Sequence, residues 1–398
     1  MKTILLTTPW PRYSEVAKLG GFKNISVWDI RDRETPAFNK SKVFSDEVYL
    51  VDFSQPDRLK NLVSWLMNHS EIDYMYHVGK DSDLELAYSL ASLHDKNKNP
   101  LDTILKVNSK SKMRDHFKEH NLSTIAYQSF DTLKDLMDLK TLPYPFIVKP
   151  TSLSGSKGVQ LCTDENELMK WSVDMKFYDY DGGYIIEEYL EGTEVSVETL
   201  SLKGEHLLVG ITDKFKTKPP LFVETGHQFP SQLPQEIQGL VQELVFEALD
   251  SLNFEFGPMH TEVIITSHGP KIVELQPRLA GDRIPRLVEI STGTVLEQEV
   301  LHMLEGRKAQ IGIKEKIAHI HYFEWAPGNL KSISGIDDIK KLDFVHDFNL
   351  NLSDGDEIPI IKDSSSRYGY VIFEASSSTD VNLKIELIES LITLDYQT

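Results

Sequence analysis

Two glutamates and an arginine near residue 270 form the strongest candidate for a chemical site in the sequence. Glu262 lies in a run at 259–266, Glu274 lies in a second run at 270–276, and Arg278 follows closely. The two runs read as a β-hairpin, so both carboxylates can project from adjacent strands towards one place. Mg²⁺ takes a few carboxylates together with substrate phosphates, and an arginine neutralises a transferring phosphoryl group. The alternative is a charge cluster at a strand edge.

A lysine and a polar loop supply candidate phosphate ligands. Lys149 ends a predicted strand at 144–150, where the strand would hold its ammonium towards a phosphate. Small residues in the following loop let backbone N–H groups turn inward around phosphate oxygens. The loop residues we expect to contact phosphate are Ser154, Gly155, Ser156 and Gly158. A solvated lysine and an ordinary flexible hairpin are the alternatives, and the loop lacks the Walker A pattern.

An acidic strand end offers a place for a nucleoside. The strand predicted at 184–190 runs into a turn at Gly192, where its backbone can meet the edge of an adenine. Glu194, just beyond the turn, can accept hydrogen bonds from ribose hydroxyls. The alternative is an acidic strand end that faces water.

These residues need a scaffold, and the first hundred residues alternate strands with helices. The strands are expected at 2–8, 24–30 and 73–78, and the helices at 14–20, 57–69 and 83–94. This alternation predicts a parallel α/β unit. No G-x-G-x-x-G follows the first strand, so the unit is not expected to bind a dinucleotide.

The rest of the chain reads as a second α/β region followed by a small α+β unit. A helix at 110–120 opens the second region, and a long amphipathic helix is expected at 235–252, with Leu240, Val241 and Val245 inward. The predicted division is 1–105, 106–317 and 318–398, with a lid at about 120–190.

Composition excludes several classes of protein. The chain has 398 residues, 40% hydrophobic and 26% charged, with a formal net charge of -19. This balance is typical of a globular protein of two or three domains and argues against nucleic-acid binding. No segment approaches the ~18 apolar residues of a membrane span. The single cysteine, Cys162, allows no internal disulfide, and with no signal peptide seen we expect a cytoplasmic location.

The motifs, taken in order, resemble the ATP-grasp superfamily, and within it the L-amino-acid ligases (dipeptide synthetases) and carnosine-synthase-like carboxylate–amine ligases. The resemblance runs from about residue 105 to 300 through KSKMR, PFIVKP, SGSKG, EEYLEGTE, HTE and ELQPRLAGD. The C-terminal segment, with Gly355-Asp356 and the run RYGYV at 367–371, is also similar. The resemblance implies an ATP-grasp fold: a parallel pre-ATP-grasp domain, an ATP-lid subdomain, a central antiparallel sheet and a small α+β subdomain.

The resemblance also implies a role for each matching residue. Lys110 and Lys149 would contact the ATP phosphates, and Arg278 would stabilise the acyl-phosphate step. The adenine pocket would be lined by Glu187, Glu188, Tyr189 and Leu190, with Glu194 on the ribose. Magnesium would be bound by Glu262, Glu274 and Gln276, and the substrates would be contacted by His227, His260 and Asp282.

Two positions depart from the family pattern. Ser109 stands where an aspartate usually precedes the first lysine, and Gln276 stands where an asparagine is usual. Gln276 keeps an amide oxygen but places it one methylene further out, which weakens the expectation that it binds metal. Asp282 has an alternative of its own, since a carboxylate at a helix start often serves only as a cap.

The function implied is ATP-dependent amide formation through an acyl phosphate, with ATP and two Mg²⁺ ions as cofactors and Mn²⁺ as an alternative metal. The substrates expected are a small carboxylate and an amine, most simply two amino acids. A homodimer is compatible with the sequence, and no membrane or nucleic-acid partner is expected. Three other functions stay open: ligation to a carrier protein or to another carboxylate, bicarbonate activation as in carboxylases, and ATP binding without turnover.

Overall fold

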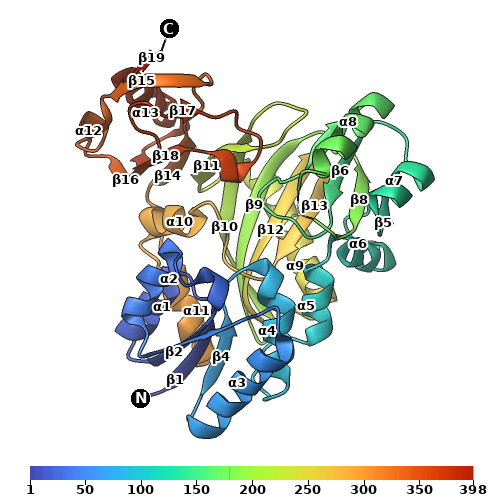
Figure 1. Ribbon diagram of the computed structural model, residues 1–398, viewed down its shortest axis with the longest axis vertical. Coiled ribbons are helices and arrows are strands. Elements are labelled where there is room, and N and C mark those ends of the chain that lie inside the picture. Colours follow the sequence, from blue (N-terminus) through green and yellow to red (C-terminus); the bar gives the residue numbers. More distant parts are fainter. Residues whose placement is uncertain (179, 398) are drawn as a thin grey trace.

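A parallel sheet with strand order β3-β2-β1-β4 begins the fold, in a computed structural model that describes residues 1–178 and 180–397 (Figure 1). Every residue of β1 is buried, as expected for a parallel strand covered on both faces. The parallel α/β prediction is therefore confirmed, although β3 and α2 were not foreseen. The strands are β1 (Thr3–Thr7), β2 (Lys23–Asp29), β3 (Glu47–Val51) and β4 (Tyr74–His77). The helices are α1 (Pro11–Leu19), α2 (Pro36–Ser41), α3 (Pro56–His69) and α4 (Leu84–Ser92), with short 3₁₀ turns η1 (Ile30–Asp32), η2 (Lys42–Phe44) and η3 (Asp81–Asp83).

A small antiparallel sheet forms the next layer, in the order β5-β8-β6-β7. Helices α5 (Leu101–Val107) and α6 (Lys110–Glu119) lead into it. Its strands are β5 (Tyr127–Phe130), β6 (Phe146–Pro150), β7 (Gln160–Cys162) and β8 (Tyr184–Glu188), and its helices are α7 (Leu133–Leu139) and α8 (Glu165–Met175). Cys162 is buried in the core of this layer. The strand at 144–150 and the loop after it thus lie where the sequence predicted.

The largest element is an eight-stranded sheet in the order β13-β12-β9-β10-β11-β14-β18-β16. Helix α9 (Gln235–Ser251) packs Val241 and Val245 into the core beneath this sheet, whereas Leu240 is 45% exposed. The inward position predicted for Leu240 is wrong, because the buried stripe is narrower than the apolar sequence pattern. The strands are β9 (Thr193–Leu202), β10 (Glu205–Lys216), β11 (Glu224–Phe229), β12 (Phe256–Thr266), β13 (Gly269–Gln276), β14 (Ile317–Tyr322), β16 (Val345–Leu350) and β18 (Gly369–Ala375).

The C-terminal part has a core of its own but shares the large sheet. Its remaining strands are β15 (Gly328–Ser334), β17 (Glu357–Ile358) and β19 (Thr393–Tyr396), with α12 (Ile336–Ile339), α13 (Ser378–Leu391) and the turn η4 (Ser364–Ser366). Helices α10 (Ile284–Thr292) and α11 (Leu296–Leu304) connect it to the N-terminal part (Figure 1). The predicted division at 317/318 falls where β14 enters the large sheet, and the three-part division stays a prediction. The last residue of the predicted third part, Thr398, lies outside the described residues.

Candidate active site

The two carboxylates singled out in the sequence face one cavity. Glu262 on β12 stands directly opposite Glu274 on β13, so the predicted hairpin is confirmed. Both side chains line a cavity of about 420 Å³ between the small sheet and the large sheet. Lys110 Nζ donates to Glu274 Oε1 at 3.1 Å, and Gln276 Nε2 donates to the same oxygen at 2.9 Å. Four of the residues expected from the sequence are therefore close together: Lys110, Glu262, Glu274 and Gln276.

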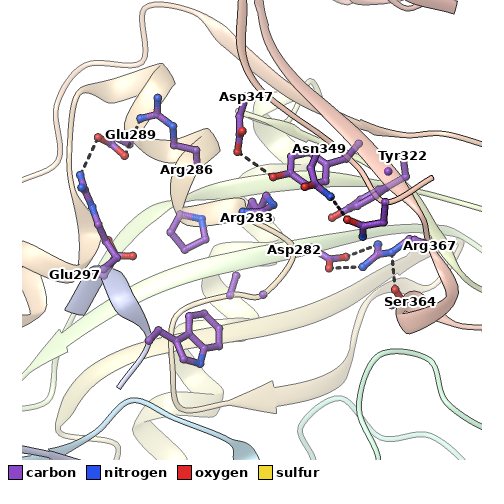
Figure 2. Close-up of a pocket in the computed structure, with 18 residues that line it drawn as sticks. Asp282, Arg283, Arg286, Glu289, Glu297, Tyr322, Asp347, Asn349, Ser364 and Arg367 are labelled. Carbon is purple, nitrogen blue, oxygen red and sulfur yellow. Dashed lines mark hydrogen bonds and ion pairs between the residues drawn. The ribbon is translucent and has the colours of Figure 1, made fainter. Parts of the chain in front are cut away.

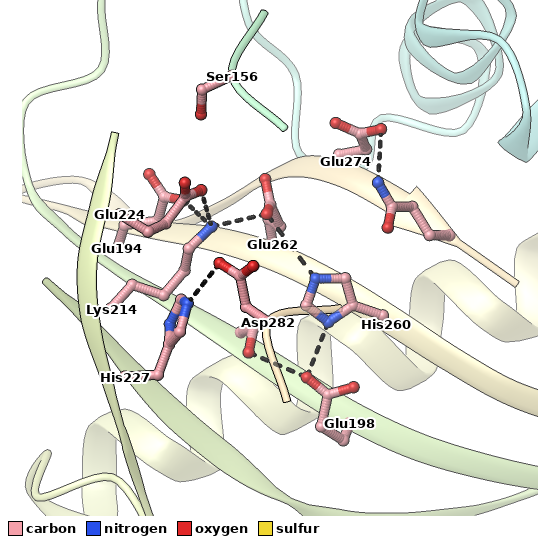
Figure 3. Close-up of polar contacts among 12 residues, drawn as sticks. Ser156, Glu194, Glu198, Lys214, Glu224, His227, His260, Glu262, Glu274 and Asp282 are labelled. Atoms are coloured by element: carbon pink, nitrogen blue, oxygen red, sulfur yellow. Dashed lines mark hydrogen bonds and ion pairs between the residues drawn. The ribbon is translucent and has the colours of Figure 1, made fainter. Parts of the chain in front are cut away.

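A buried lysine that we did not foresee joins three carboxylates in this cavity (Figure 3). Lys214 Nζ on β10 lies 2.6 Å from both Glu194 Oε1 and Glu262 Oε1, and 3.7 Å from Glu224 Oε1. Burial alone would lower the pKa of Lys214, but the carboxylates raise it well above its ordinary value. Burial would likewise raise the pKa of Glu262, yet Lys214 holds it well below the usual range. The members of this cluster are therefore charged. The positive charge of Lys214 offsets the negative charge of the glutamates, which would otherwise repel phosphates from the cavity.

A second buried ion cluster fixes the far wall of the cavity. Glu187 Oε1 accepts from Arg114 Nε at 2.6 Å, and its Oε2 lies 2.7 Å from Lys149 Nζ. Arg114 also donates to the carbonyls of Ile272 and Val273, so it ties α6 to β8 and β13. Burial opposes ionisation of Glu187, but Arg114 and Lys149 lower its pKa to about 2. The carboxylate of Glu187 is thus engaged by protein cations, and it orients Lys149 within the cavity.

The loop after β6 adopts the tight conformation that a phosphate-binding turn requires. The φ angles of Gly155, Ser156 and Gly158 are 69°, 59° and 68°, in the left-handed region that favours glycine. Ser156 Oγ donates to the carbonyl of Phe222 at 3.1 Å, which holds the loop over the cavity. Gly158 lies outside the cavity lining, against Met175. The lining residues from this loop are Leu153, Ser154, Gly155, Ser156 and Val159.

The same cavity has an apolar end suited to a flat base. The residues that the resemblance assigned to adenine and ribose line this cavity, among them Glu188, Tyr189, Leu190 and Glu194. Glu194 is held by Lys214 and Lys216, which together lower its pKa against the opposing effect of burial. The apolar side chains along this end are Ile147, Val159, Tyr189, Leu190, Phe222 and Ile264.

Arg278 sits at the edge of this arrangement and is held by the N-terminal part. Its Nε and Nη2 donate to the two oxygens of Asp81 at 2.5 and 2.9 Å. Burial alone would raise the pKa of Asp81, but Arg278 lowers it. Arg278 does not line the 420 Å³ cavity, whereas Asp81 lies in a small cleft together with Glu274 and Gln276. The Asp81 contact could not be foreseen, because it joins positions 197 residues apart.

A larger cavity of about 830 Å³ lies between α10 and the C-terminal part (Figure 2). Asp282 on its wall forms a bidentate pair with Arg367, at 2.6 and 2.9 Å, and lies 3.0 Å from His227 Nε2. Burial would raise the pKa of Asp282, but His227 and Arg367 lower it far below its usual value. Arg367 also stacks on the ring of Tyr322 at 3.8 Å. Two of the substrate-side candidates, His227 and Asp282, are thus in contact.

The two cavities adjoin. Ser364 lines the larger cavity, Glu224 lines the smaller one, and Ser364 Oγ donates to Glu224 Oε2 at 2.7 Å. The backbone N–H of Ser364 donates to the carbonyl of Gly155 at 3.2 Å, so the turn η4 also contacts the phosphate-type loop. A molecule bound in one cavity would therefore lie next to a molecule bound in the other cavity.

His260, the third substrate-side candidate, lines neither cavity. Its Nδ1 lies 2.8 Å from Glu198 Oε1, and its Nε2 lies 3.8 Å from Glu262 Oε1. Burial alone would lower the pKa of His260, but the two glutamates raise it to about 9. The imidazolium is thus positioned beneath Glu262 rather than facing open space (Figure 3).

The raised pKa of His260 predicts a pH-dependent stability. Because its pKa is 6.5 in a model peptide and about 9 here, its stabilisation is complete below pH 6.5 and disappears as the pH rises through 9. We expect a loss of roughly 3 kcal/mol in the free energy of unfolding across this window. Urea unfolding from pH 6 to 10 checks this, with exposed His268→Gln as the control for His260→Gln. An unchanged pH slope in the His260 variant would contradict the assignment.

Comparisons with known proteins agree with this geometry. A family model described as "ATP-grasp domain" matches residues 142–286, and one described as "L-amino acid ligase C-terminal domain 2" matches residues 321–397. The chain carries an ATP-grasp domain. The matched range contains the loop, β8 and the β12–β13 hairpin, and so holds most of the smaller cavity's lining.

Individual relatives point in the same direction. Alanine–anticapsin ligase of Bacillus subtilis (strain 168) is 30% identical over 206 residues, which are 46% of this chain and 43% of that protein. Dapdiamide A synthase of Enterobacter agglomerans is 23% identical over 227 residues, 54% of this chain and 53% of that protein. The chain thus spans about half the length of these relatives.

A solved structure is similar in fold to this chain over its whole length. The crystal structure of an L-amino acid ligase from Bacillus licheniformis matches with a TM-score of 0.82 at 21% identity, covering 100% of this chain and 99% of that one. At this identity the match shows the fold. The predicted ATP-grasp architecture is therefore confirmed.

The donor set near Glu262 fits a magnesium ion that also binds phosphate. In residues 1–178 and 180–397 no three His, Cys, Asp or Glu side chains gather as a ready cation site. Two opposed carboxylates and the amide of Gln276 would leave coordination positions for phosphate oxygens and water, which suits Mg²⁺. Of two structures of similar fold, a biotin carboxylase domain of Hydrogenobacter thermophilus was solved with the magnesium salt of ADP, and an N5-carboxyaminoimidazole synthetase of Staphylococcus aureus with ADP. In the described part of the chain, no helix is long and apolar enough to cross a membrane.

Proposed function

We propose that this chain is an ATP-dependent carboxylate–amine ligase that joins two small substrates, most simply amino acids, through an acyl phosphate. The observation that carries the proposal is the contact between the two cavities. One has lysines, opposed glutamates and an apolar end suited to ATP, and the other is polar and large enough for amino acids. The names of the relatives, which describe alanine–anticapsin ligation and dapdiamide synthesis, support the same reaction type.

In the first step an oxygen of the carboxylate substrate attacks the γ-phosphorus of ATP. The new O–P bond gives an acyl phosphate, and the bond to the β-phosphate oxygen breaks to release ADP. Lys110, Lys149 and the N–H groups of the loop at Ser154–Ser156 would hold the phosphates in line, since catalysis of phosphoryl transfer is mainly positioning and charge neutralisation. Lys214 would stabilise the negative charge that gathers where the phosphates bind.

In the second step the amine nitrogen attacks the acyl carbon, loses a proton and expels phosphate. Arg278, anchored by Asp81, would steady the developing oxyanion at the edge of the site. Closure of the loop, which already contacts Ser364, would keep water from hydrolysing the acyl phosphate.

Glu262 and Glu274, with Gln276, would hold magnesium, which when bound neutralises charge on the phosphates. Two ions, with Mn²⁺ as a substitute, are part of the proposal, as are a homodimer and a cytoplasmic location for a chain whose one cysteine is buried. The residue roles given in the sequence analysis are retained with four exceptions. Glu187 acts here through Lys149 and Arg114, and Asp282 is paired with Arg367 and His227. Gly158 and His260 line neither cavity.

The test is ADP release from Mg²⁺-ATP across pairwise mixtures of the common amino acids, with mass spectrometry of the products. A dipeptide mass that accumulates together with ADP is the expected result. ADP release that requires bicarbonate instead would indicate a carboxylase-type enzyme, and ATP binding without ADP release in any mixture would reject turnover of amino acids. Glu274→Gln serves as the inactive reference.

A further inference from the structure

Four arginines line the larger cavity, and within residues 1–178 and 180–397 one of them has no ion pair. Arg367 is paired with Asp282, and Arg286 Nη1 lies 2.9 Å from Glu289 Oε2. Arg12 is shared between Glu289 and Glu15. Among the residues that the structure describes, no carboxylate lies within 4.0 Å of the fourth arginine, Arg283, and none of the contacts drawn in Figure 2 reaches it.

Arg283 is nonetheless held in a defined position. Its guanidinium lies 4.2 Å from the centre of the Tyr370 ring, and Tyr370 donates its hydroxyl to Asp347 at 3.0 Å. A guanidinium stacked flat on an aromatic ring keeps its N–H edge free to donate. The backbone φ angles of Asp282 and Arg283 are 47° and 61°, an uncommon conformation that directs the two adjacent side chains to different neighbours.

Two further carboxylates of the cavity form no ion pair with Arg283. Glu297 and Asp347 line the same cavity, but among the described residues no ion pair joins either of them to Arg283. Burial raises the pKa of Glu297, and Asp347 accepts the hydroxyl of Tyr370. Among the described residues, Arg283 is therefore a cation held in a fixed position with no carboxylate within 4.0 Å and with its donors free.

We propose that Arg283 binds the carboxylate of the amine substrate, so that the acceptor is a free amino acid rather than a carrier-bound or simple amine. This inference rests on the proposed ligase function. A carboxylate matches the planar donor edge of a guanidinium in a bidentate manner. With its carboxylate at Arg283, the acceptor lies in the cavity whose wall at Ser364 and Glu224 adjoins the ATP cavity, where the acyl phosphate would form.

The first arm of the test uses the unaltered protein. ADP release and amide product are measured with each of the twenty common L-amino acids as acceptor, and again with the corresponding α-carboxamides. We expect the acids to be used with a KM roughly 10- to 100-fold lower than that of the amides, the range for hydrogen bonds to a charged group. Equal use of acids and amides overturns the inference even if no variant folds.

The second arm uses Arg283→Gln, with Arg283→Lys as the conservative variant and exposed Arg307→Gln as a matched loss of charge elsewhere. Arg283→Gln should raise the KM of the acid roughly 10- to 100-fold with little change in kcat, and leave the KM of the amide unchanged. Lysine should restore part of the loss. Equal increases for acid and amide would mean a structural role and overturn the inference.

The two proposals fail differently. If no mixture gives ADP and an amide product, the ligase function itself is wrong and the inference falls with it. If amide forms but the acceptor carboxylate does not matter, only the role of Arg283 is wrong.

Discussion

Glu274→Gln should lower ADP release roughly 100- to 1,000-fold, the cost of removing one preorganised group that stabilises transition-state charge. Glutamine keeps the size of the side chain and can still accept from Lys110, so the fold should persist. What it loses is the negative charge opposite Glu262, and with it the pair of carboxylates available to a divalent cation. The measurement is ADP formation at saturating Mg²⁺-ATP with the best amino-acid mixture.

Two controls sharpen this prediction. Glu243→Gln, on the exposed face of α9, removes the same charge far from the cavity and should leave turnover unchanged. Raising the Mg²⁺ concentration should recover part of the activity of Glu274→Gln if the defect is weakened metal binding. Near wild-type turnover in Glu274→Gln would remove this residue from the mechanism.

The local patterns of the sequence were sufficient to predict where Glu262 and Glu274 meet. A hairpin with a short connection leaves few registers, and the alternation of side chains decides which ones share a face. The same holds for Lys149 and its loop, since both belong to one strand–loop–strand segment. The ATP-grasp architecture was implied by the resemblance of these ordered segments to a known superfamily.

Lys214 and Arg367 escaped prediction because their partners are distant in the sequence. Lys214 pairs with carboxylates on β9, β11 and β12, and only the packing of the large sheet brings these strands together. A signal was present: a lysine in the apolar alternating run of β10 must be paired if it is buried. Identifying the partners nevertheless requires the strand order, which the sequence alone does not provide.

The Asp282 prediction was limited in the same way, because the partners of this carboxylate are distant in the sequence. A substrate contact was expected at this carboxylate from the family resemblance. The structure gives Asp282 two protein partners, Arg367 and His227, so its charge is already balanced. Arg283 next to it keeps its charge unpaired, which is why the further inference moves the substrate contact by one residue.

Arg114→Met should destabilise the protein by roughly 3–5 kcal/mol, because it leaves one partner of a buried ion pair behind. The Arg114 and Glu187 side chains are 1% and 6% exposed, and Arg114 also satisfies two backbone carbonyls of β13. Lys149 remains beside Glu187 but cannot replace these contacts. Urea unfolding monitored by tryptophan fluorescence measures the effect, with exposed Lys118→Met on the same helix as the control.

The pH dependence of the stability difference between the unaltered protein and Arg114→Met identifies the cause of that difference. Because the pKa of Glu187 is about 2 in the folded protein and 4.5 in a model peptide, the ion pair contributes fully above pH 4.5. That contribution is lost as the pH falls through 2, so the gap between the unaltered protein and Arg114→Met should shrink between these values. A gap that stays constant down to low pH would show that Arg114 acts through its carbonyl contacts and packing rather than through the charge of Glu187.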